Sequence, residues 1–209
     1  MNRLVITMGD PCGVGPEIIV KFFDGIYKVE DKRLFLVVVG SKSVLEYYKK
    51  KLRIDLEIVE ITKAHIVDGK LENGKLHLIN IDTDIDKLEF GKHTELGGAL
   101  SIKYLDKAIE LCHGKYVDGI VTCPISKDSI NMAGFKYSGH TEYLAEKSKT
   151  EDFAMVLKGK KVVVLLNSTH VSLKEAINRV TKESVLNKIR LAQKAKKELG
   201  LTGSIAVAG

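Results

Sequence analysis

The feature that most constrains this chain is a loop rich in Gly and Pro that joins a strand-like run to a helix-like run near the N-terminus. The apolar run Leu4–Ile6 leads into Gly9–Glu17, a loop with three glycines, two prolines and Asp10. Gly permits backbone conformations that other residues avoid, and Pro suits the first turn of a helix. The pattern predicts a buried strand over residues 3–8, a tight loop, and a helix that begins near Pro16.

Two interpretations of this loop stay open. Its glycines at positions 9, 13 and 15 fit neither the dinucleotide fingerprint G-x-G-x-x-G nor the P-loop, which needs a following Lys. A helix N-terminus still offers free N–H groups to an anion, and Gly allows a ligand to come close to the backbone. The alternative is a strained turn with a purely structural role.

Strand-like and helix-like segments alternate along the rest of the chain, which favours an α/β fold with a mostly parallel sheet. Asp-Gly and Asn-Gly signals predict a hairpin over residues 66–81, and a tight turn predicts an antiparallel pair over 153–158 and 162–167. The other expected strands are 34–39, 56–61, 116–121 and 204–208, and the other expected helices follow Ser41 or span 95–112, 172–178 and 182–199.

Composition favours a cytoplasmic protein with no membrane partner. In 209 residues with 44% hydrophobic content, no apolar run approaches the roughly 20 residues that cross a bilayer, and no signal peptide is evident. The three cysteines are scattered, so we expect neither a disulfide framework nor a metal cluster built from them. The net charge of +6 suits an anionic small substrate, whereas the lysine clusters read as solvated helix faces and not as a nucleic-acid site.

Several polar residues stand where side chains can reach a ligand. Lys127, in the loop after a predicted strand, could hold an anion or transfer a proton, and a solvated lysine is an equal alternative. His140 and Thr141 stand at an expected helix start, as anion contacts or as an ordinary cap. His170 follows a strand, as a metal ligand, a substrate contact or a structural residue. Asp10 is open as a cap, a ligand or a ribose contact, and the remaining histidines are read as surface residues: His65, His77, His93 and His113.

Four motifs in order resemble those of the 4-hydroxythreonine-4-phosphate dehydrogenase (PdxA) family. Gly9–Glu17 is similar to its GDPxGIGPE signature, and Thr122–Lys127 to its TAPINK loop, with Cys and Ser as departures. Gly139–Glu142 matches its GHTE motif. Thr169–Leu173 resembles its THxPL segment, with Ser172 in place of Pro.

The resemblance implies α/β/α layers like those of isocitrate and isopropylmalate dehydrogenases, in a two-lobed and usually dimeric enzyme with its active site at the subunit interface. It implies that NAD oxidises 4-phosphohydroxy-L-threonine and that decarboxylation then gives 3-amino-2-oxopropyl phosphate for pyridoxal phosphate (vitamin B6) biosynthesis. It also implies a divalent metal (Zn, Mg or Co) on His170 and substrate contacts from His140 and Thr141. The catalytic role of Lys127 is our own assignment from its position, and the residues that hold NAD are left open. We expect His140 and His170 to share one pocket.

The family continues past the last predicted strand with an Asn-Pro-His-Ala-Gly-Glu motif that is absent here. We therefore expect residues 1–209 to be the N-terminal two-thirds of the two-lobed enzyme, with a lobe boundary that the sequence leaves open and with little or no activity alone. Two alternatives remain: a dehydrogenase of a related four-carbon phosphate, threonate or erythronate phosphate, and a truncated, non-catalytic anion-binding paralogue.

Overall fold

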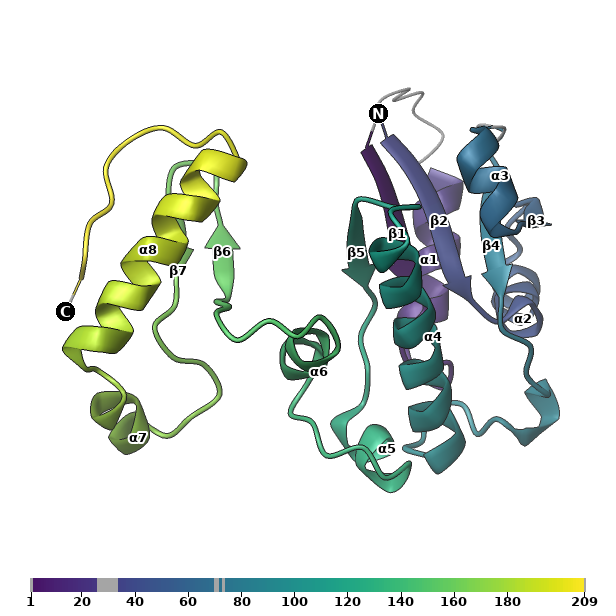
Figure 1. The fold of residues 1–209 in the computed structure, drawn as a ribbon. Helices are drawn as coiled ribbons and strands as arrows, with labels where there is room; N and C mark the ends of the chain where they lie inside the picture. Colours follow the sequence, from purple (N-terminus) through teal and green to yellow (C-terminus); the bar gives the residue numbers. More distant parts are fainter. Residues whose placement is uncertain (1, 26–33, 70–71, 73, 209) are drawn as a thin grey trace. The chain divides into compact units, whose positions relative to one another are not determined.

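The computed structural model describes residues 2–25, 34–69, 72 and 74–208, and it divides into two compact units. The first runs to Leu144 and the second begins at Ala145. Figure 1 shows the elements of each unit, and each unit is described here by itself.

The first unit is built on a five-stranded parallel sheet, as the alternating pattern predicts. Its strand order is β3-β4-β2-β1-β5, and every pairing in it is parallel. Such a sheet is covered on both faces, which explains why its strands are continuous apolar runs. The strands are β1 (Asn2–Thr7), β2 (Leu34–Gly40), β3 (Ile58–Glu60), β4 (Leu76–Asn80) and β5 (Gly119–Thr122).

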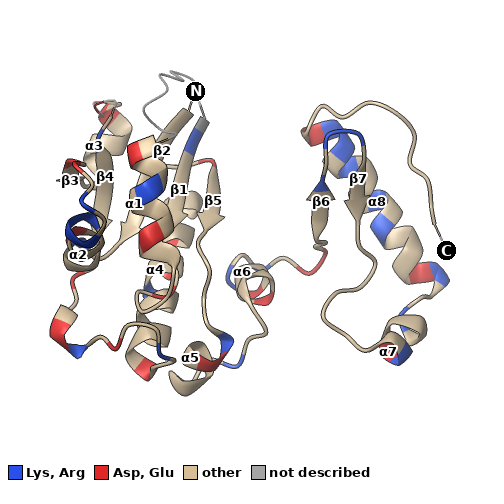
Figure 2. Cartoon of the chain, turned by 180° about the vertical axis from the view of Figure 1, so that it is seen from behind, with Lys and Arg blue, Asp and Glu red and all other residues tan. Residues whose placement is uncertain are grey.

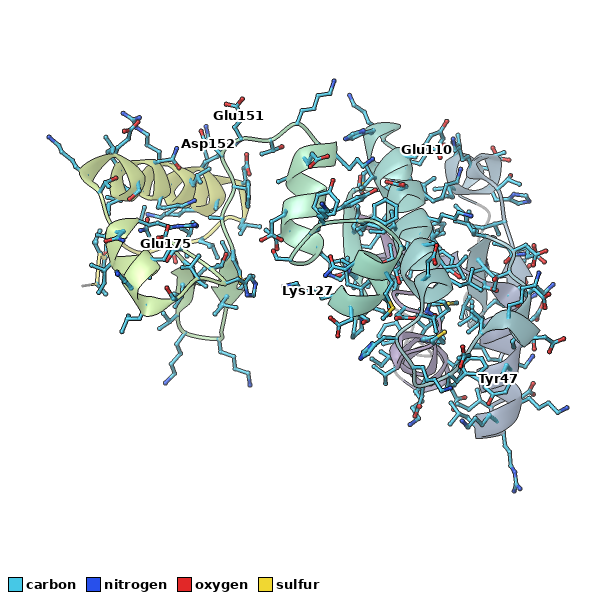
Figure 3. The ribbon with its side chains drawn as sticks, turned by 90° about the horizontal axis from the view of Figure 1, so that it is seen from below. Tyr47, Glu110, Lys127, Glu151, Asp152 and Glu175 are labelled. Carbon is cyan, nitrogen blue, oxygen red and sulfur yellow. The ribbon has the colours of Figure 1, made fainter. Side chains whose placement is uncertain are left out.

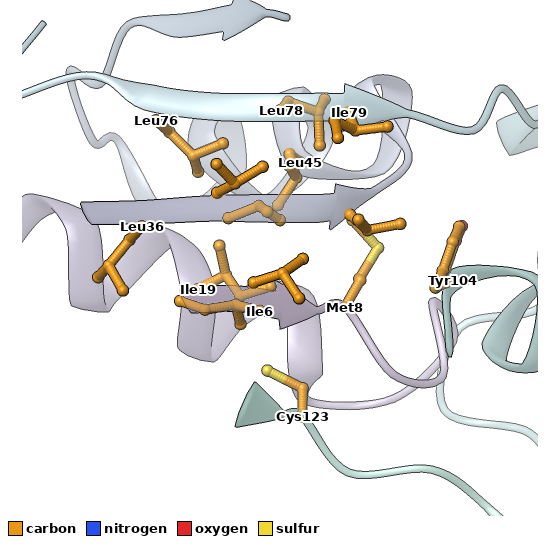
Figure 4. Packing of buried hydrophobic residues seen from close by; sticks show 14 of the residues in the cluster. Ile6, Met8, Ile19, Leu36, Leu45, Leu76, Leu78, Ile79, Tyr104 and Cys123 are labelled. Carbon is orange, nitrogen blue, oxygen red and sulfur yellow. The ribbon is translucent and has the colours of Figure 1, made fainter. Parts of the chain in front are cut away.

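Helices cover this sheet and close its core. Val37, Val38 and Val39 of the central strand β2 are fully buried, and Figure 4 shows the surrounding layer of Leu, Ile and Met side chains. The longest of these helices presents Tyr104 to the core with none of its surface exposed. The helical elements of the unit are α1 (Gly15–Gly25), α2 (Lys42–Leu52), α3 (Lys63–Asp68), η1 (Ile85–Lys87), α4 (Glu95–His113), α5 (Lys127–Met132) and α6 (His140–Lys147), whose last residues enter the second unit.

The second unit contains the predicted antiparallel pair. Strands β6 (Val156–Lys158) and β7 (Val163–Leu165) pair antiparallel, and the Gly159 N–H donates to the Val162 carbonyl at the turn. Two helices follow, and both were expected: α7 (Leu173–Asn178) and α8 (Lys182–Glu198). Among its described residues from 146 to 208, none is buried, so this unit has only a thin apolar layer of its own.

The excess positive charge lies in the second unit. Residues 145–209 contain 13 Lys and Arg against 6 Asp and Glu, whereas residues 1–144 contain 20 against 21. In the ribbon of Figure 2, the blue segments that mark Lys and Arg lie along α8 and at the β6–β7 turn. The charge is therefore less evenly spread than the sequence pattern alone indicates.

The predicted hairpin over residues 66–81 is wrong. Residues 63–68 form α3, and β4 pairs parallel to both β3 and β2. Gly69, which was read as a turn residue, has φ +64° and ends α3 as its C-cap. The second signal includes residue 73, which lies outside the described residues. The side chains of Leu78 and Ile79 point to opposite faces of β4 and both are buried, and a strand buried on both faces belongs in the parallel sheet.

The predicted strand over residues 204–208 is also wrong. These residues carry no strand pairing with any described part of the chain. An apolar, β-branched segment becomes a strand only where a neighbouring edge accepts its backbone N–H and C=O groups, and the sequence pattern does not contain that information.

We predict that Gly98→Ala destabilises the first unit by about 1–3 kcal/mol because it overpacks the contact between α4 and α5. A Cβ at Gly98 would lie 1.9 Å from the Ser129 carbonyl oxygen, which is backbone and cannot move aside cheaply. Urea unfolding of the two variants measures the change. The matched control is Gly25→Ala, where nothing lies within 4 Å of the new methyl group, so equal stability losses would contradict the close approach.

Candidate functional site

Three segments of the first unit meet around one surface pocket: the loop after β1, the stretch that leads into α4, and the loop after β5. The two loops lie side by side because β1 and β5 are adjacent parallel strands, with Thr7 opposite Thr122. The pocket measures about 380 Å³ and is lined by residues 10 and 12–14, residues 91–93 and residues 124–128. Crevices at the carboxyl ends of parallel strands are where open α/β sheets bind ligands.

The glycines of the opening loop have a structural explanation. Gly9 has φ +72°, and a Cβ there would lie 2.2 Å from the Pro124 carbonyl oxygen. A Cβ at Gly15 would lie 2.0 Å from the Met8 carbonyl oxygen. Both glycines therefore allow close backbone approach within the protein itself, between the two loops and between the loop and α1.

Asp10 connects the opening loop to α5. Its carboxylate, on a residue only 4% exposed, accepts hydrogen bonds from the Cys12 N–H at 2.9 Å and from the Ser129 hydroxyl at 2.9 Å. The Asp10 N–H donates to the Pro124 carbonyl at 3.0 Å. With one bond on each oxygen and almost no exposure, Asp10 acts as an internal anchor, a role that was not among those left open for it by the sequence.

Thr94 connects the third wall of the pocket, the stretch that leads into α4, to Ser129. Its N–H donates to the Ser129 hydroxyl oxygen at 3.3 Å, and its side chain caps α4 by accepting from the Gly97 N–H. Just before it, the Gly91 N–H donates to the Cys12 carbonyl at 2.8 Å. We call Asp10, Ser129 and Thr94 the polar junction, because its bonds join all three walls of the pocket.

Charged and polar side chains line this pocket. Lys127, the first residue of α5, is exposed and forms no ion pair within the described part of the chain (Figure 3). His93 also lines the pocket and contacts both neighbours of Lys127: its Nδ1 is 2.8 Å from the Ser126 hydroxyl and its Nε2 is 3.9 Å from the Asp128 carboxylate. The structure thus places Lys127, a predicted site residue, in the wall of a pocket. His93 lines the same pocket; it is exposed and was read from the sequence as a surface residue. Its only sequence signal was its place just before the α4 cap, Thr94.

The buried thiols of this region are poor nucleophiles. Burial raises the pKa of the Cys123 thiol to about 11, and burial is also the largest cause of the raised pKa of Cys12. Because the thiolate is the reactive form, both sulfurs stay protonated and inert at neutral pH. Cysteine-based catalysis is therefore not the chemistry of this pocket.

His140 and Thr141 open α6, in the same unit. The Nε2 atom of His140 is buried and has no hydrogen-bond partner among the described residues, and burial lowers the pKa of this imidazole. Buried polar atoms normally form a hydrogen bond, and a bound ligand could supply the one that this nitrogen lacks among the described residues. Thr141 lies inside the helix, so it is not the cap of α6 that the sequence allowed.

His170 belongs to the second unit, between β7 and α7. It is exposed and its φ is +55°, a left-handed conformation that is uncommon for a residue with a side chain. Because each unit is described by itself, the pairing of His140 with His170 stays a prediction. Nowhere in residues 2–25, 34–69, 72 or 74–208 do three or more His, Cys, Asp or Glu side chains gather as a metal site.

Nor does any helix in these ranges have the length and apolar character to cross a membrane.

Comparison with known proteins identifies the class to which this fold and these loops belong. Residues 32–209 match the family model described as "Pyridoxal phosphate biosynthetic protein PdxA". The chain therefore belongs to the PdxA family, and the predicted family resemblance is confirmed.

The relatives are dehydrogenases by name. The chain is 40% identical over 198 residues to the 4-hydroxythreonine-4-phosphate dehydrogenase of Sulfurihydrogenibium sp. (strain YO3AOP1), covering 95% of this chain and 59% of that protein. It is 39% identical over 209 residues to the "Putative D-threonate 4-phosphate dehydrogenase" of Fusobacterium nucleatum, covering 100% of this chain and 62% of that protein. The crystal structure of the 4-hydroxythreonine-4-phosphate dehydrogenase of Klebsiella pneumoniae superposes with a TM-score of 0.85 at 28% identity, over 95% of this chain and 59% of that one. The chain thus spans about 60% of the length of the relatives that it matches, and the predicted fold class is confirmed.

We predict that His140 makes folding sensitive to acid. Its pKa in the folded state lies below the ordinary 6.5, so the unfolded state takes up a proton first as the pH falls. Stability is then full above about pH 6.5 and is lost as the pH drops toward the folded-state pKa. Urea unfolding at about pH 8 and about pH 5.5 measures this loss, which His140→Gln should reduce because Gln does not titrate.

The exposed His113→Gln is the matched control, and it should leave the acid loss unchanged. His77 is also buried with a lowered pKa, so only the difference between the wild type and the variant reports on His140. An imidazole of His140 that titrates at or above 6.5 in an NMR pH series would contradict the prediction.

Proposed function

We propose that this chain is part of an NAD-dependent dehydrogenase of a phosphorylated four-carbon hydroxy acid, with 4-phosphohydroxy-L-threonine as the substrate and pyridoxal phosphate biosynthesis as the pathway. The hydroxyl of this substrate is β to its carboxylate. Hydride transfer to NAD gives a β-keto acid, and the loss of carbon dioxide then gives 3-amino-2-oxopropyl phosphate. Membership of the PdxA family and the dehydrogenase relatives support the reaction class.

The observation that carries the proposal is the buried Nε2 of His140, which has no hydrogen-bond partner among the described residues; Thr141 follows it in the first turn of α6. A buried polar atom without a hydrogen bond costs about 1–3 kcal/mol, and a substrate oxygen at this point would remove the cost. The N-terminal end of α6 adds a positive field that favours an anionic substrate. In this proposal His140 and Thr141 bind and orient the substrate.

Lys127 is the proposed acid–base residue. It is the one lysine of the pocket without an ion pair in the described part of the chain, because Lys92 pairs with Glu89 at 2.7 Å. An ammonium group in a pocket can neutralise a developing alkoxide or return a proton to the product. Its exposure also permits simple anion binding, and the two roles separate in a pH–rate profile.

His170 is the proposed metal ligand, and its left-handed backbone supports a functional role, since such strain clusters at ligand-binding residues. A neutral imidazole suits Zn best, Co next and Mg least, because Mg prefers oxygen ligands. One imidazole does not make a metal site, so the other ligands would come from outside the described residues, in keeping with a homodimer whose active site lies at the subunit interface. For the same reason we propose that residues 1–209 alone have little or no activity.

A second substrate has a specific observation in its favour. One relative, whose match covers 100% of this chain, is named "Putative D-threonate 4-phosphate dehydrogenase". D-threonate 4-phosphate shares the phosphate, the four-carbon chain and the hydroxyl, and it differs in bearing a hydroxyl where 4-phosphohydroxy-L-threonine bears an amino group. The reaction class is the same for both substrates.

The test is NADH formation by the purified longer protein of which we propose this chain is part, supplied with NAD, a divalent cation and each substrate in turn. We expect turnover, and we expect His140→Ala to lower kcat/KM by about tenfold to a hundredfold, which corresponds to one lost charge-assisted hydrogen bond.

His113→Ala is the matched control and should retain full activity, since His113 is exposed and lies outside the pocket. Absence of NADH with both substrates would contradict the reaction class. Turnover that survives His140→Ala unchanged would contradict the substrate-binding role alone.

A further inference from the structure

The reaction proposed above takes its substrate and metal contacts from His140, Thr141 and His170 and gives Lys127 a role in proton transfer. It assigns no phosphate group to the pocket at the polar junction, which Lys127 lines. The walls of this pocket carry several hydrogen-bond donors. Lys127 and His93 line the pocket and supply side-chain donors. Val14 lines it as well and the buried Gly15 follows it, and neither backbone N–H donates to another described residue. These donors come from three separate segments of the chain, so they converge only in the folded unit.

We propose that this pocket binds a phosphate group through Lys127, His93 and the N–H groups of Val14 and Gly15. Lys127 brings a full positive charge with no competing ion pair among the described residues. The imidazole of His93 is held by the Ser126 hydroxyl at 2.8 Å on its Nδ1 side, which fixes the ring and leaves Nε2 toward the Asp128 side of the pocket.

The backbone contribution is independent of the side chains. α1 has 11 residues, and the positive end of its dipole lies at Gly15, next to the pocket residues Gly13 and Val14. Pro16 follows and has no N–H, so the donors at this end are concentrated in the loop.

The donor set is rigid, which favours binding. The junction of Asp10, Ser129 and Thr94 fixes the three walls to one another. The Tyr48 hydroxyl adds a bond to the Gly13 carbonyl at 3.3 Å, just before the donor residues. Donors that are already in place lose little entropy when an anion binds.

Two carboxylates oppose an anion here, and they differ in effect. The Asp10 carboxylate is occupied by two internal hydrogen bonds and is almost fully buried. Asp128 is exposed at the rim, 3.9 Å from His93 Nε2, and repels an incoming phosphate. This gives the proposal a signed test, because removal of Lys127 and removal of Asp128 should act in opposite directions.

The test is a titration of the isotope-labelled 209-residue chain with inorganic phosphate, followed by NMR. We expect saturable shifts of the Val14, Gly15 and His93 resonances. Lys127→Ala should weaken phosphate binding about tenfold, and Asp128→Asn should strengthen it severalfold. Lys103→Ala removes an exposed lysine on α4 outside the pocket and should change nothing.

Two sources of phosphate are then compared by competition: NAD, which carries a pyrophosphate, and 4-phosphohydroxy-L-threonine, which carries a monophosphate. Displacement of inorganic phosphate by NAD identifies a cofactor subsite, and displacement by the ester identifies a substrate subsite. Shifts that do not saturate, that are insensitive to Lys127→Ala, or that neither molecule abolishes would mean an adventitious ion only and would overturn the proposal. Because binding is measured without turnover, that failure leaves the dehydrogenase proposal standing.

Discussion

The first unit depends on a buried carboxylate. Asp10 accepts a hydrogen bond from the Cys12 N–H and another from the Ser129 hydroxyl. Asp10 and Ser129 are 119 positions apart in the sequence. A buried carboxylate without such partners is costly, so the folded state keeps both donors in place. Since Ser129 also accepts from the Thr94 N–H, one charged group determines how the loop after β1, the start of α4 and the start of α5 meet.

The close approach of these segments requires residues without side chains. Gly9 and Gly98 each lie where a Cβ would fall within about 2 Å of a backbone oxygen, of Pro124 and of Ser129 respectively. Short distances between backbones leave room for hydrogen bonds at the junction and for a pocket beside it. Gly9 and Gly98 therefore allow the close packing beside the pocket, and in our proposal the donors to a phosphate come from Val14, His93 and Lys127, which line it.

The sequence predicted what local patterns determine. Buried strands, the long helix α4 and the antiparallel pair were evident from apolar runs and turn residues, and the four motifs indicated the family. The hairpin over 66–81 failed because Gly69 serves equally as a turn residue and as a helix C-cap, and only tertiary pairing distinguishes the two. His93 is exposed, as expected, but its place in the pocket was not predicted, because its contact with Ser126 joins residues that are 33 apart in sequence. Contacts of that kind leave no periodic signal.

The measurement that tests this account most directly is a double-mutant cycle between Asp10→Ala and Ser129→Ala, with the free energy of unfolding of the first unit followed in urea. If the carboxylate and the hydroxyl hold the walls of the pocket together, the two losses are coupled by about 1–2 kcal/mol, as expected for a buried hydrogen bond to a charged group. Losses that add to within about 0.3 kcal/mol would contradict it, since independent sites behave in that way.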